Sequence, residues 1–568
     1  MTSHNGRHPA GGPLSRRTVL GRSVVTAASA ATVLCLDTPA RALPATADEN
    51  GAPTGRAPLG PVRVETGRLS GTTAALPGVT VFQGVPYAAT TAGEHRWRPP
   101  RPAPAWSGVR AADAFGDACP QGIPPWVTSP PTMSEDCLNL NIWTSDTEPR
   151  ARRPVFVWFY GGRFNSGFAS DPAFDGAGLA RRGLVVVTVN YRTGPLGFLT
   201  VPELTAESAN GSSGNYGLLD QIAALEWVRR NISAFGGDPG RVTIAGQSAG
   251  AASVLDLVYS PLARGLFHRA VAESGALGPH DPEIAALAGS YRPSLATAES
   301  QGTAWAAQRG ATTLAEMRAL TVTEVLSDGD QNDSTVSGPV NGAPPLFRPV
   351  LDGYVLARSY ADSLASGLHN DVPVLTGNNK DESGASPTPA TTLAAFRDLA
   401  SRKYGSMADE FLKLYPATDD TQAGEQTNAS IRDGFRVSTS LWATAWARRA
   451  KSPVFTYFWT HAPPGAALIP GMTGAYHGSE MNYVFDNLYG TDRPWTAEDR
   501  RIADTLSSYI VNFATHGDPN QAGLPNWSPA RPGGFSTMEL GDGWGRIPDA
   551  GAAETDFFRR YYPTEPAW

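Results

Sequence analysis

The sequence lacks three features that would each have indicated a class of protein. The first is cysteine and histidine in clusters: there are only three cysteines, no Cys-x-x-Cys pair and no histidine-rich tract. A disulfide-dense scaffold is therefore excluded, and nothing indicates a metal site of clustered cysteine and histidine. The second is runs of lysine and arginine. Their absence and the formal net charge of −7 argue against nucleic acid as a partner.

The third missing feature is a long apolar run. Outside the amino-terminal segment, no stretch of the sequence approaches the ~20 apolar residues that a membrane span requires, so none is predicted. Hydrophobic residues nevertheless make up 41% of the 568 residues. That is enough for a large buried core.

The amino-terminal residues have the pattern of an export signal. Arg16 and Arg17 precede a modestly apolar region that runs to Leu36, and residues 40–42 read Ala-Arg-Ala, like a cleavage site. We therefore predict that residues 1–42 are a twin-arginine-type signal that is removed, and that the protein is secreted. A disordered cytosolic extension is the alternative.

The residues after the signal divide into a lead-in and a folded part. Residues 43–61 are rich in Ala, Pro, Gly and Thr, which predicts a flexible lead-in. Residues 62–568 are predicted to form a single domain. Removal of the signal, which contains Cys35, would leave two cysteines, Cys119 and Cys137. They lie 18 positions apart and flank a proline-rich loop. In an exported protein we expect them to form a disulfide, worth ~3 kcal/mol in the chain-entropy description; two buried free thiols are the alternative.

Apolar runs alternate with helical patterns through the middle of the chain. Residues 218–228 place apolar side chains at i, i+3, i+4 and i+7, which indicates a helix. Continuous apolar runs are typical of strands buried on both faces. Their alternation predicts an α/β fold with a mainly parallel sheet covered on both sides. The runs are residues 154–160, 184–191, 242 onward, 372–377 and 453–459.

Other parts of the chain are less regular. Residues 62–66 and 79–82 have strand character, and we expect them to pair as a small separate sheet. Residues 278–347 and 390–437 are expected to form helices and loops over the edge of the main sheet that carries the active site.

One stretch has the pattern of a nucleophile elbow. An apolar run over residues 242–245 leads into Gly-Gln-Ser-Ala-Gly at residues 246–250, and small residues follow. A serine at so sharp a strand-to-helix turn exposes its hydroxyl, and its neighbours must be small to avoid a clash. Ser248 is therefore the candidate nucleophile. The alternative is an ordinary glycine-rich strand–helix connection.

A serine nucleophile needs a histidine base, and the base needs an acid that orients it. In this architecture the chain order is serine, acid, histidine. The residues alone leave several choices open: Asp352, Asp381 and Glu382 for the acid, and His461, His477 and His516 for the base. Asp381 and Glu382 follow a buried strand through a turn, His477 lies in a glycine-flanked loop, and His461 ends an apolar strand.

Four further motifs resemble the type-B carboxylesterase family, the cholinesterase-like branch of the α/β-hydrolases. They are residues 82–88 (Phe-Gln-Gly-Val-Pro-Tyr-Ala), 134–143 (Ser-Glu-Asp-Cys-Leu-Asn-Leu-Asn-Ile-Trp), 190–199 (Asn-Tyr-Arg-Thr-Gly-Pro-Leu-Gly-Phe-Leu) and 235–239 (Phe-Gly-Gly-Asp-Pro). The resemblance runs from about residue 62 to the carboxyl terminus. It implies the α/β-hydrolase fold, a serine esterase activity and no cofactor.

The resemblance also implies roles for particular residues. The family's acid lies in a segment like residues 377–382, where it corresponds to Glu382, and its histidine precedes Gly-x-Glu, as His477 does. The implied triad is Ser248, Glu382 and His477. The implied oxyanion hole consists of the backbone N–H groups of Gly162, Arg163 and Ala249.

The sequence departs from the family pattern at two positions. Arg163 stands where the family has Gly or Ala, and Gln247 stands where cholinesterases have Glu. The Arg163 side chain is expected either to pair with a surface acid or to border the acyl pocket, where it would bind a carboxylate of the substrate. Gln247 removes a negative charge from the same site. Trp126 is a third candidate for substrate contact, with a packing role as the alternative.

The sequence thus predicts a secreted hydrolase of small-molecule esters. A lipase or polyester hydrolase of the same chemistry is one alternative. A non-catalytic cholinesterase-like binding module is another, although the complete Ser–His–Glu set argues against it. His268, Ser274 and His516 are interpreted as structural or surface residues.

Overall fold

The computed structural model describes residues 59–124, 127–285, 291–292, 294–336, 343–382, 389–466, 472–532 and 537–567. The predicted export signal therefore lies outside the described residues, and so does all but the end of the predicted lead-in.

The described residues are built around one large sheet of eleven strands, in the order β14-β13-β12-β11-β10-β9-β7-β8-β6-β4-β3. Neighbouring strands from β13 to β8 are parallel, whereas β14 and the group β6, β4 and β3 pair antiparallel at the two edges. This confirms the predicted mainly parallel sheet. The strands are β3 (Thr72–Thr73), β4 (Thr80–Pro86), β6 (Asn139–Thr144), β7 (Arg153–Phe159), β8 (Val185–Val189), β9 (Gly237–Gln247), β10 (Arg269–Glu273), β11 (Val374–Asn379), β12 (Val454–Trp459), β13 (Thr537–Leu540) and β14 (Gly545–Ile547).

A second, three-stranded sheet consists of β1 (Val62–Val64), β2 (Gly67–Ser70) and β5 (Val109–Ala111). The expectation that residues 79–82 join the first of these strands is wrong. Residues 80–82 lie in β4, which pairs with β3 and β6 in the large sheet. The reason is burial: Val81, Phe82 and Val85 are almost fully buried, and the large sheet offers them the main core.

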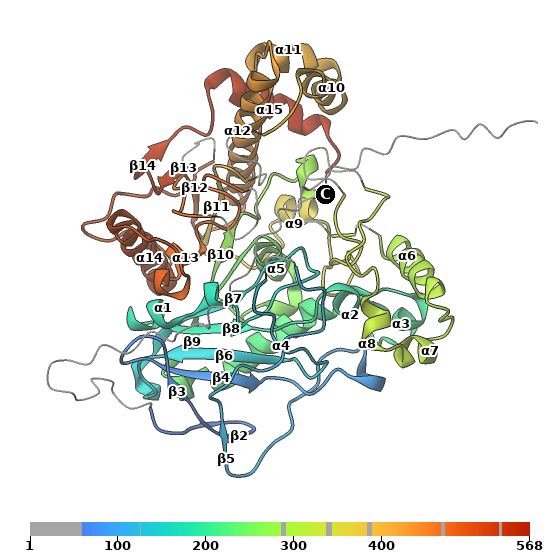
Figure 1. Ribbon diagram of the computed structural model, residues 1–568, viewed down its shortest axis with the longest axis vertical. Helices are drawn as coiled ribbons and strands as arrows, with labels where there is room; N and C mark the ends of the chain where they lie inside the picture. Colours follow the sequence, from blue (N-terminus) through green and yellow to red (C-terminus); the bar gives the residue numbers. More distant parts are fainter. Residues whose placement is uncertain are drawn as a thin grey trace, which may run out of the picture. The chain divides into compact units, whose positions relative to one another are not determined.

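Helices cover both faces of the large sheet, as Figure 1 shows for α5 on one side of the central strands and α14 on the other. Hydrophobic side chains of the strands are enclosed between them, which explains why β7, β8 and β12 are buried along nearly their whole length. The helices are α1 (Ala177–Arg181), α2 (Gly194–Phe198), α3 (Pro202–Glu207), α4 (Tyr216–Asn231), α5 (Ala249–Tyr259), α6 (Leu295–Gln308), α7 (Leu314–Ala319), α8 (Val322–Leu326), α9 (Tyr360–Ser366), α10 (Leu393–Tyr404), α11 (Ala408–Leu414), α12 (Asp420–Ala447), α13 (Met481–Val484), α14 (Ala497–His516) and α15 (Ala552–Tyr561).

The long helix α12 was not foreseen from the sequence, which indicated only helices and loops for residues 390–437. The helix is 28 residues long and begins at the side-chain cap of Asp419. One end packs on β11 and β12, and α10, α11 and α15 surround the other around a smaller aromatic cluster (Figure 1). The helix thereby reaches the edge of the sheet where the candidate site lies.

Cys119 and Cys137 form a disulfide with an S–S distance of 2.03 Å, as predicted. The loop that they close also contacts the sheet, because the Gln121 amide exchanges hydrogen bonds with the backbone N–H and carbonyl of Gly167. Among the described helices, none is long and apolar enough to cross a membrane.

Candidate active site

Ser248 lies at the turn between β9 and α5, with φ 59° and ψ −125°. A non-glycine residue in this region carries backbone strain that the surroundings must stabilise. Here they do so sterically. A Cβ on Gly250 would come within 2.1 Å of the Phe159 carbonyl oxygen, and one on Gly246 within 2.4 Å of the Gly250 carbonyl carbon. Only glycines fit, so the elbow pattern has the predicted conformation.

The segment after β7 lies directly against this elbow. A Cβ on Gly161 would come within 2.6 Å of the Gln247 carbonyl oxygen and 3.1 Å of the Ser248 Cβ. Gly162 and Arg163 follow with φ values of 113° and 58°. This turned backbone leaves the N–H groups of both residues without an acceptor among the described residues.

A third backbone donor comes from the helix on the other side of Ser248. Ala249 is the first residue of α5, so its N–H has no acceptor within the helix. The predicted oxyanion-hole residues Gly162, Arg163 and Ala249 thus lie on the two segments that adjoin Ser248, the turn after β7 and the start of α5.

Glu382 and His477 are brought together from segments 95 residues apart. The distance from Glu382 Oε2 to His477 Nδ1 is 2.5 Å. Glu382 follows β11, and its other oxygen accepts a hydrogen bond of 2.7 Å from the Asn379 backbone N–H. The two segments are joined beside this pair, because the Asp381 N–H donates to the Ala475 carbonyl and the Ala475 N–H to the Asp381 carboxylate.

The far nitrogen of His477 contacts Gln247 instead of Ser248. The Gln247 Nε2 lies 3.2 Å from His477 Nε2. Because an amide nitrogen only donates, His477 Nε2 accepts and Nδ1 carries the proton shared with Glu382. This is the neutral tautomer that a general base requires. The Ser248 hydroxyl makes no hydrogen bond to any described residue, a looseness common in unliganded hydrolase sites.

The other candidates for acid and base have different partners. Asp381 binds Arg432 at 2.5 Å, and Asp352 accepts hydrogen bonds from two backbone N–H groups of its own turn. His461 lies between Asp499 and Asp542, at 3.0 and 2.7 Å. His516 is an exposed residue at the end of α14. None of these residues contacts Ser248 or His477.

Two buried carboxylates, one on the strand beside Gln247 and one shortly after His477 in the chain, were not predicted as site residues. Glu273 ends β10 and Glu480 follows His477 by three positions; they are 2% and 1% exposed. Neither oxygen of Glu273 has a partner among the described residues, and one oxygen of Glu480 accepts a hydrogen bond from the Asn379 amide. Burial and the charge of Glu480 raise the pKa of Glu273 well above its ordinary value. Burial and the charge of Glu382 raise the pKa of Glu480 to about 7.

Two neighbouring carboxylates, Glu382 and Glu480, affect the titration of His477. Burial alone would lower its pKa, but the charge and hydrogen bond of Glu382 and the charge of Glu480 outweigh burial, so the pKa of His477 is raised. The sequence signal for Glu480 was the Gly-Ser-Glu that follows His477. The signal for Glu273 was the acid at the end of an apolar strand, next to Ser274.

Comparison with known proteins identifies the family. The sequence profile described as the carboxylesterase family matches residues 60–543. The chain belongs to the carboxylesterase family. It is an enzyme, a carboxylic-ester hydrolase.

Individual relatives of this carboxylesterase cover most of its length. It is 36% identical to the fumonisin B1 esterase of Sphingopyxis macrogoltabida, over 79% of this chain and 81% of that protein. It is 34% identical to the para-nitrobenzyl esterase of Bacillus subtilis, over 82% of this chain and 91% of that protein. Among solved structures, a PNB esterase superposes with a TM-score of 0.72 and 30% identity, covering 88% of this chain and 99% of that one.

Arg163 does not pair with a surface acid, so that expectation is wrong. The partly exposed guanidinium donates from Nη2 to the Asn332 side-chain oxygen at 3.1 Å and to the Ala343 carbonyl at 3.2 Å. Both acceptors are neutral oxygens, although Asp330 and Asp333 flank Asn332 in the sequence. Gln247 does lie in the site, against His477. Trp126, the third predicted substrate contact, lies outside the described residues.

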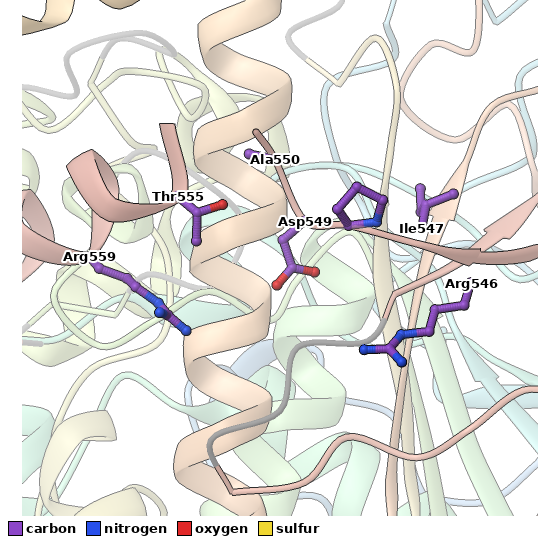
Figure 2. A pocket seen from close by; sticks show the side chains of 7 residues that line it. Arg546, Ile547, Asp549, Ala550, Thr555 and Arg559 are labelled. Atoms are coloured by element: carbon purple, nitrogen blue, oxygen red, sulfur yellow. The ribbon is translucent and has the colours of Figure 1, made fainter. Parts of the chain in front are cut away.

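Nothing in the described part of the carboxylesterase suggests a metal, since no group of three or more His, Cys, Asp or Glu side chains is placed to hold one. A surface pocket of about 400 Å³ lies between β14 and α15. There, Arg546 and Arg559 point inward from opposite sides with Asp549 between them (Figure 2). Its lining includes no histidine that could act as a base, so it is not a second candidate active site.

Proposed function

We propose that the enzyme hydrolyses esters through an acyl-enzyme, with Ser248 as nucleophile, His477 as base and Glu382 as the acid that orients it. One observation carries this proposal. The pair formed by His477 and Glu382 holds the neutral tautomer beside the strained serine elbow, next to backbone N–H groups without acceptors. These are the parts that serine acyl transfer requires.

The proposed reaction has two halves. Ser248 Oγ attacks the ester carbonyl while its proton passes to His477 Nε2, and the oxyanion is bound by the N–H groups of Gly162, Arg163 and Ala249. His477 then gives the proton to the leaving alcohol. A water molecule, deprotonated by His477, attacks the acyl-enzyme and releases the acid. Because Gln247 contacts the same nitrogen, its amide must move aside before the proton can transfer.

The substrate is proposed to be a small-molecule ester. Para-nitrobenzyl esters are a reasonable first choice, since the Bacillus relative is named for them. A lipase or polyester hydrolase would use the same residues and differ only in the pocket. A non-catalytic binding role is disfavoured, because each residue that the chemistry needs is present.

The decisive test replaces the nucleophile. Ser248→Ala should reduce hydrolysis to a few per cent or less, and a fluorophosphonate probe should label Ser248 in the wild type. His477→Ala should lower kcat by several orders of magnitude. The matched control is His461→Ala, which removes a histidine with two carboxylate partners outside the site and should mainly affect stability. An active His477→Ala enzyme together with an inactive His461→Ala enzyme would refute the assignment.

We further propose that the enzyme is exported by the twin-arginine route and acts outside the cell. The support is the pattern at Arg16 and Arg17 and the apolar region that follows. Replacing both arginines with lysine should shift esterase activity from the medium to the cytoplasm. Unchanged secretion would count against this route.

A further inference from the structure

We infer that Arg163 selects esters whose acid part carries a free carboxylate, by binding that carboxylate with its guanidinium. The inference rests on the proposed function, because it takes Ser248 as the point of attack. The position of the side chain, its charge and the charges opposite it each support it.

The position follows from the order of the strands. Ser248 ends β9, Arg163 follows β7 on one side of it, and Glu382 follows β11 on the other. In acyl transfer the histidine protonates the leaving alcohol, so the alcohol part of the ester lies on the side of His477. The acid part therefore extends toward the β7 side. Arg163 is on that side, two residues after Gly161, which packs against the elbow.

Within the described part of the chain, the guanidinium of Arg163 has no counter-ion. No carboxylate of the described residues lies within 4 Å of it, and its two acceptors are the neutral oxygens of Asn332 and Ala343. Partial burial lowers the pKa of Arg163 and no neighbouring acid raises it. The acid beside Asn332 is already committed, because Asp333 pairs with the buried Arg348 at 3.0 Å.

The hydrogen-bonding capacity of Arg163 is also incompletely used. Only Nη2 donates to described residues, which leaves the N–H groups of Nε and Nη1 available. Each of these groups can donate a charge-assisted hydrogen bond to a carboxylate oxygen, and a two-pronged contact would form if Nη2 released one of its present acceptors. The hydrogen bonds to Asn332 and Ala343 meanwhile restrict the side chain, so less rotamer entropy is lost when an anion binds.

The opposite side of Ser248 would repel an anion. Glu382 and Glu480 lie beside His477, where the charge of each raises the pKa of the imidazole, and the same negative charge opposes a further carboxylate there. Gln247 adds no negative charge of its own. The site is therefore electrostatically asymmetric, and an anionic group on the substrate is favoured only on the Arg163 side.

The experiment compares two esters that differ only in charge. One is the mono-p-nitrophenyl ester of a short dicarboxylic acid; the other is the same compound with its second carboxylate capped as a methyl ester. The ratio of kcat/KM between them is measured for the wild type, Arg163→Gln and Arg163→Lys. A ratio is used because Arg163 also supplies a backbone N–H, so a displaced turn would slow both esters equally.

We expect Arg163→Gln to lower the ratio about 10- to 100-fold, the effect of losing a charged hydrogen bond. Arg163→Lys should retain part of the preference for the carboxylate-bearing ester, since lysine keeps the positive charge but lacks the planar guanidinium. The wild-type ratio should also fall with added salt, and that of Arg163→Gln should not. If Gln and Lys fold poorly at φ 58°, Arg163→Gly removes the side chain without strain.

A second pair of esters tests the side of the scissile bond. Here the carboxylate is on the phenol part, as in carboxyphenyl acetate against phenyl acetate, and Arg163→Gln should not change the ratio. A selective loss on this pair instead would overturn the assignment to the acid part. If Arg163→Gln left the ratio on the first pair unchanged, the role of Arg163 would be overturned. The proposed function would still stand in that case, provided that the enzyme hydrolyses the capped ester and the probe labels Ser248.

Discussion

At the scale of single residues, the site is unusual in its backbone conformations. Arg163, Phe164 and Ser248 all have positive φ values near 60°, although none is glycine. Such residues cost about 1–3 kcal/mol each and persist only where neighbouring structure enforces them. The turn after β7 leaves the backbone N–H groups of Gly162 and Arg163 without acceptors among the described residues. The strain is therefore the local cost of assembling the proposed oxyanion hole.

The titration of His477 makes a prediction at the same scale. Only the neutral imidazole can take the Ser248 proton, and the pKa of His477 is raised. The acid limb of kcat/KM should therefore lie at higher pH than an ordinary histidine would give, with activity falling as the pH drops through that pKa. Since the charge of Glu480 helps to raise the pKa, Glu480→Gln should move the limb to lower pH.

The control for this prediction is Glu226→Gln. Glu226 is half exposed on α4, beside Arg230, and its charge is not among the causes of the His477 shift. Its removal should leave the pH profile of kcat/KM where it was. A Glu480→Gln profile that overlays the wild type would contradict the electrostatic account.

At the scale of elements, the strand–turn–helix unit of β9 and α5 depends on one close contact. A Cβ on Gly250 would lie 2.1 Å from the Phe159 carbonyl oxygen and 3.0 Å from the Tyr160 carbonyl carbon. Both are backbone atoms of the neighbouring strand and its end, and they cannot rotate away. Gly250→Ala should therefore destabilise the enzyme by about 3 kcal/mol or more and displace Ser248, with loss of both thermal midpoint and activity.

Gly545→Ala is the matched control. Gly545 begins β14, has no positive φ, and nothing lies within 4 Å of its ideal Cβ. Its melting midpoint should match that of the wild type closely. Equal midpoints for the two variants would show that the elbow relaxes and that steric fit does not enforce it.

At the scale of the whole molecule, the disulfide closes the loop of residues 119–137 by linking its two ends. Both cysteines are fully buried, and the loop reaches Gly167, shortly after the oxyanion turn, through Gln121. Replacing both cysteines with alanine should lower the free energy of unfolding by ~3 kcal/mol, as expected for a loop of this size. Thermal unfolding with and without a reductant measures this.

The reductant provides an internal comparison for the disulfide. It should lower the midpoint of the wild type toward that of the double variant and leave the double variant itself unchanged. A wild type that is insensitive to complete reduction would mean that packing alone holds the loop.

Much of this fold was predictable because its signals are local. Burial requires apolar residues within the strands themselves, as in β7, β8, β11 and β12. The tight turn at Ser248 likewise requires small residues at the adjacent positions. The placement of residues 80–82 in the large sheet was not predictable, since strand character does not say which partner a strand pairs with. The length of α12 was missed for a similar reason: its helix is stabilised by packing against other elements.

By itself, the sequence determined the α/β class, the serine elbow and a short set of acids and histidines. The family resemblance implied Glu382 and His477, and the tertiary structure brings these two together across 95 residues through the pairing of β11 with its neighbours and the link between Asp381 and Ala475. The tertiary structure also decided the hydrogen-bond partners of Arg163 and the position of Glu273 on the strand beside Gln247. These are matters of distance between residues far apart in the chain, and the charges that act at a site depend on those distances.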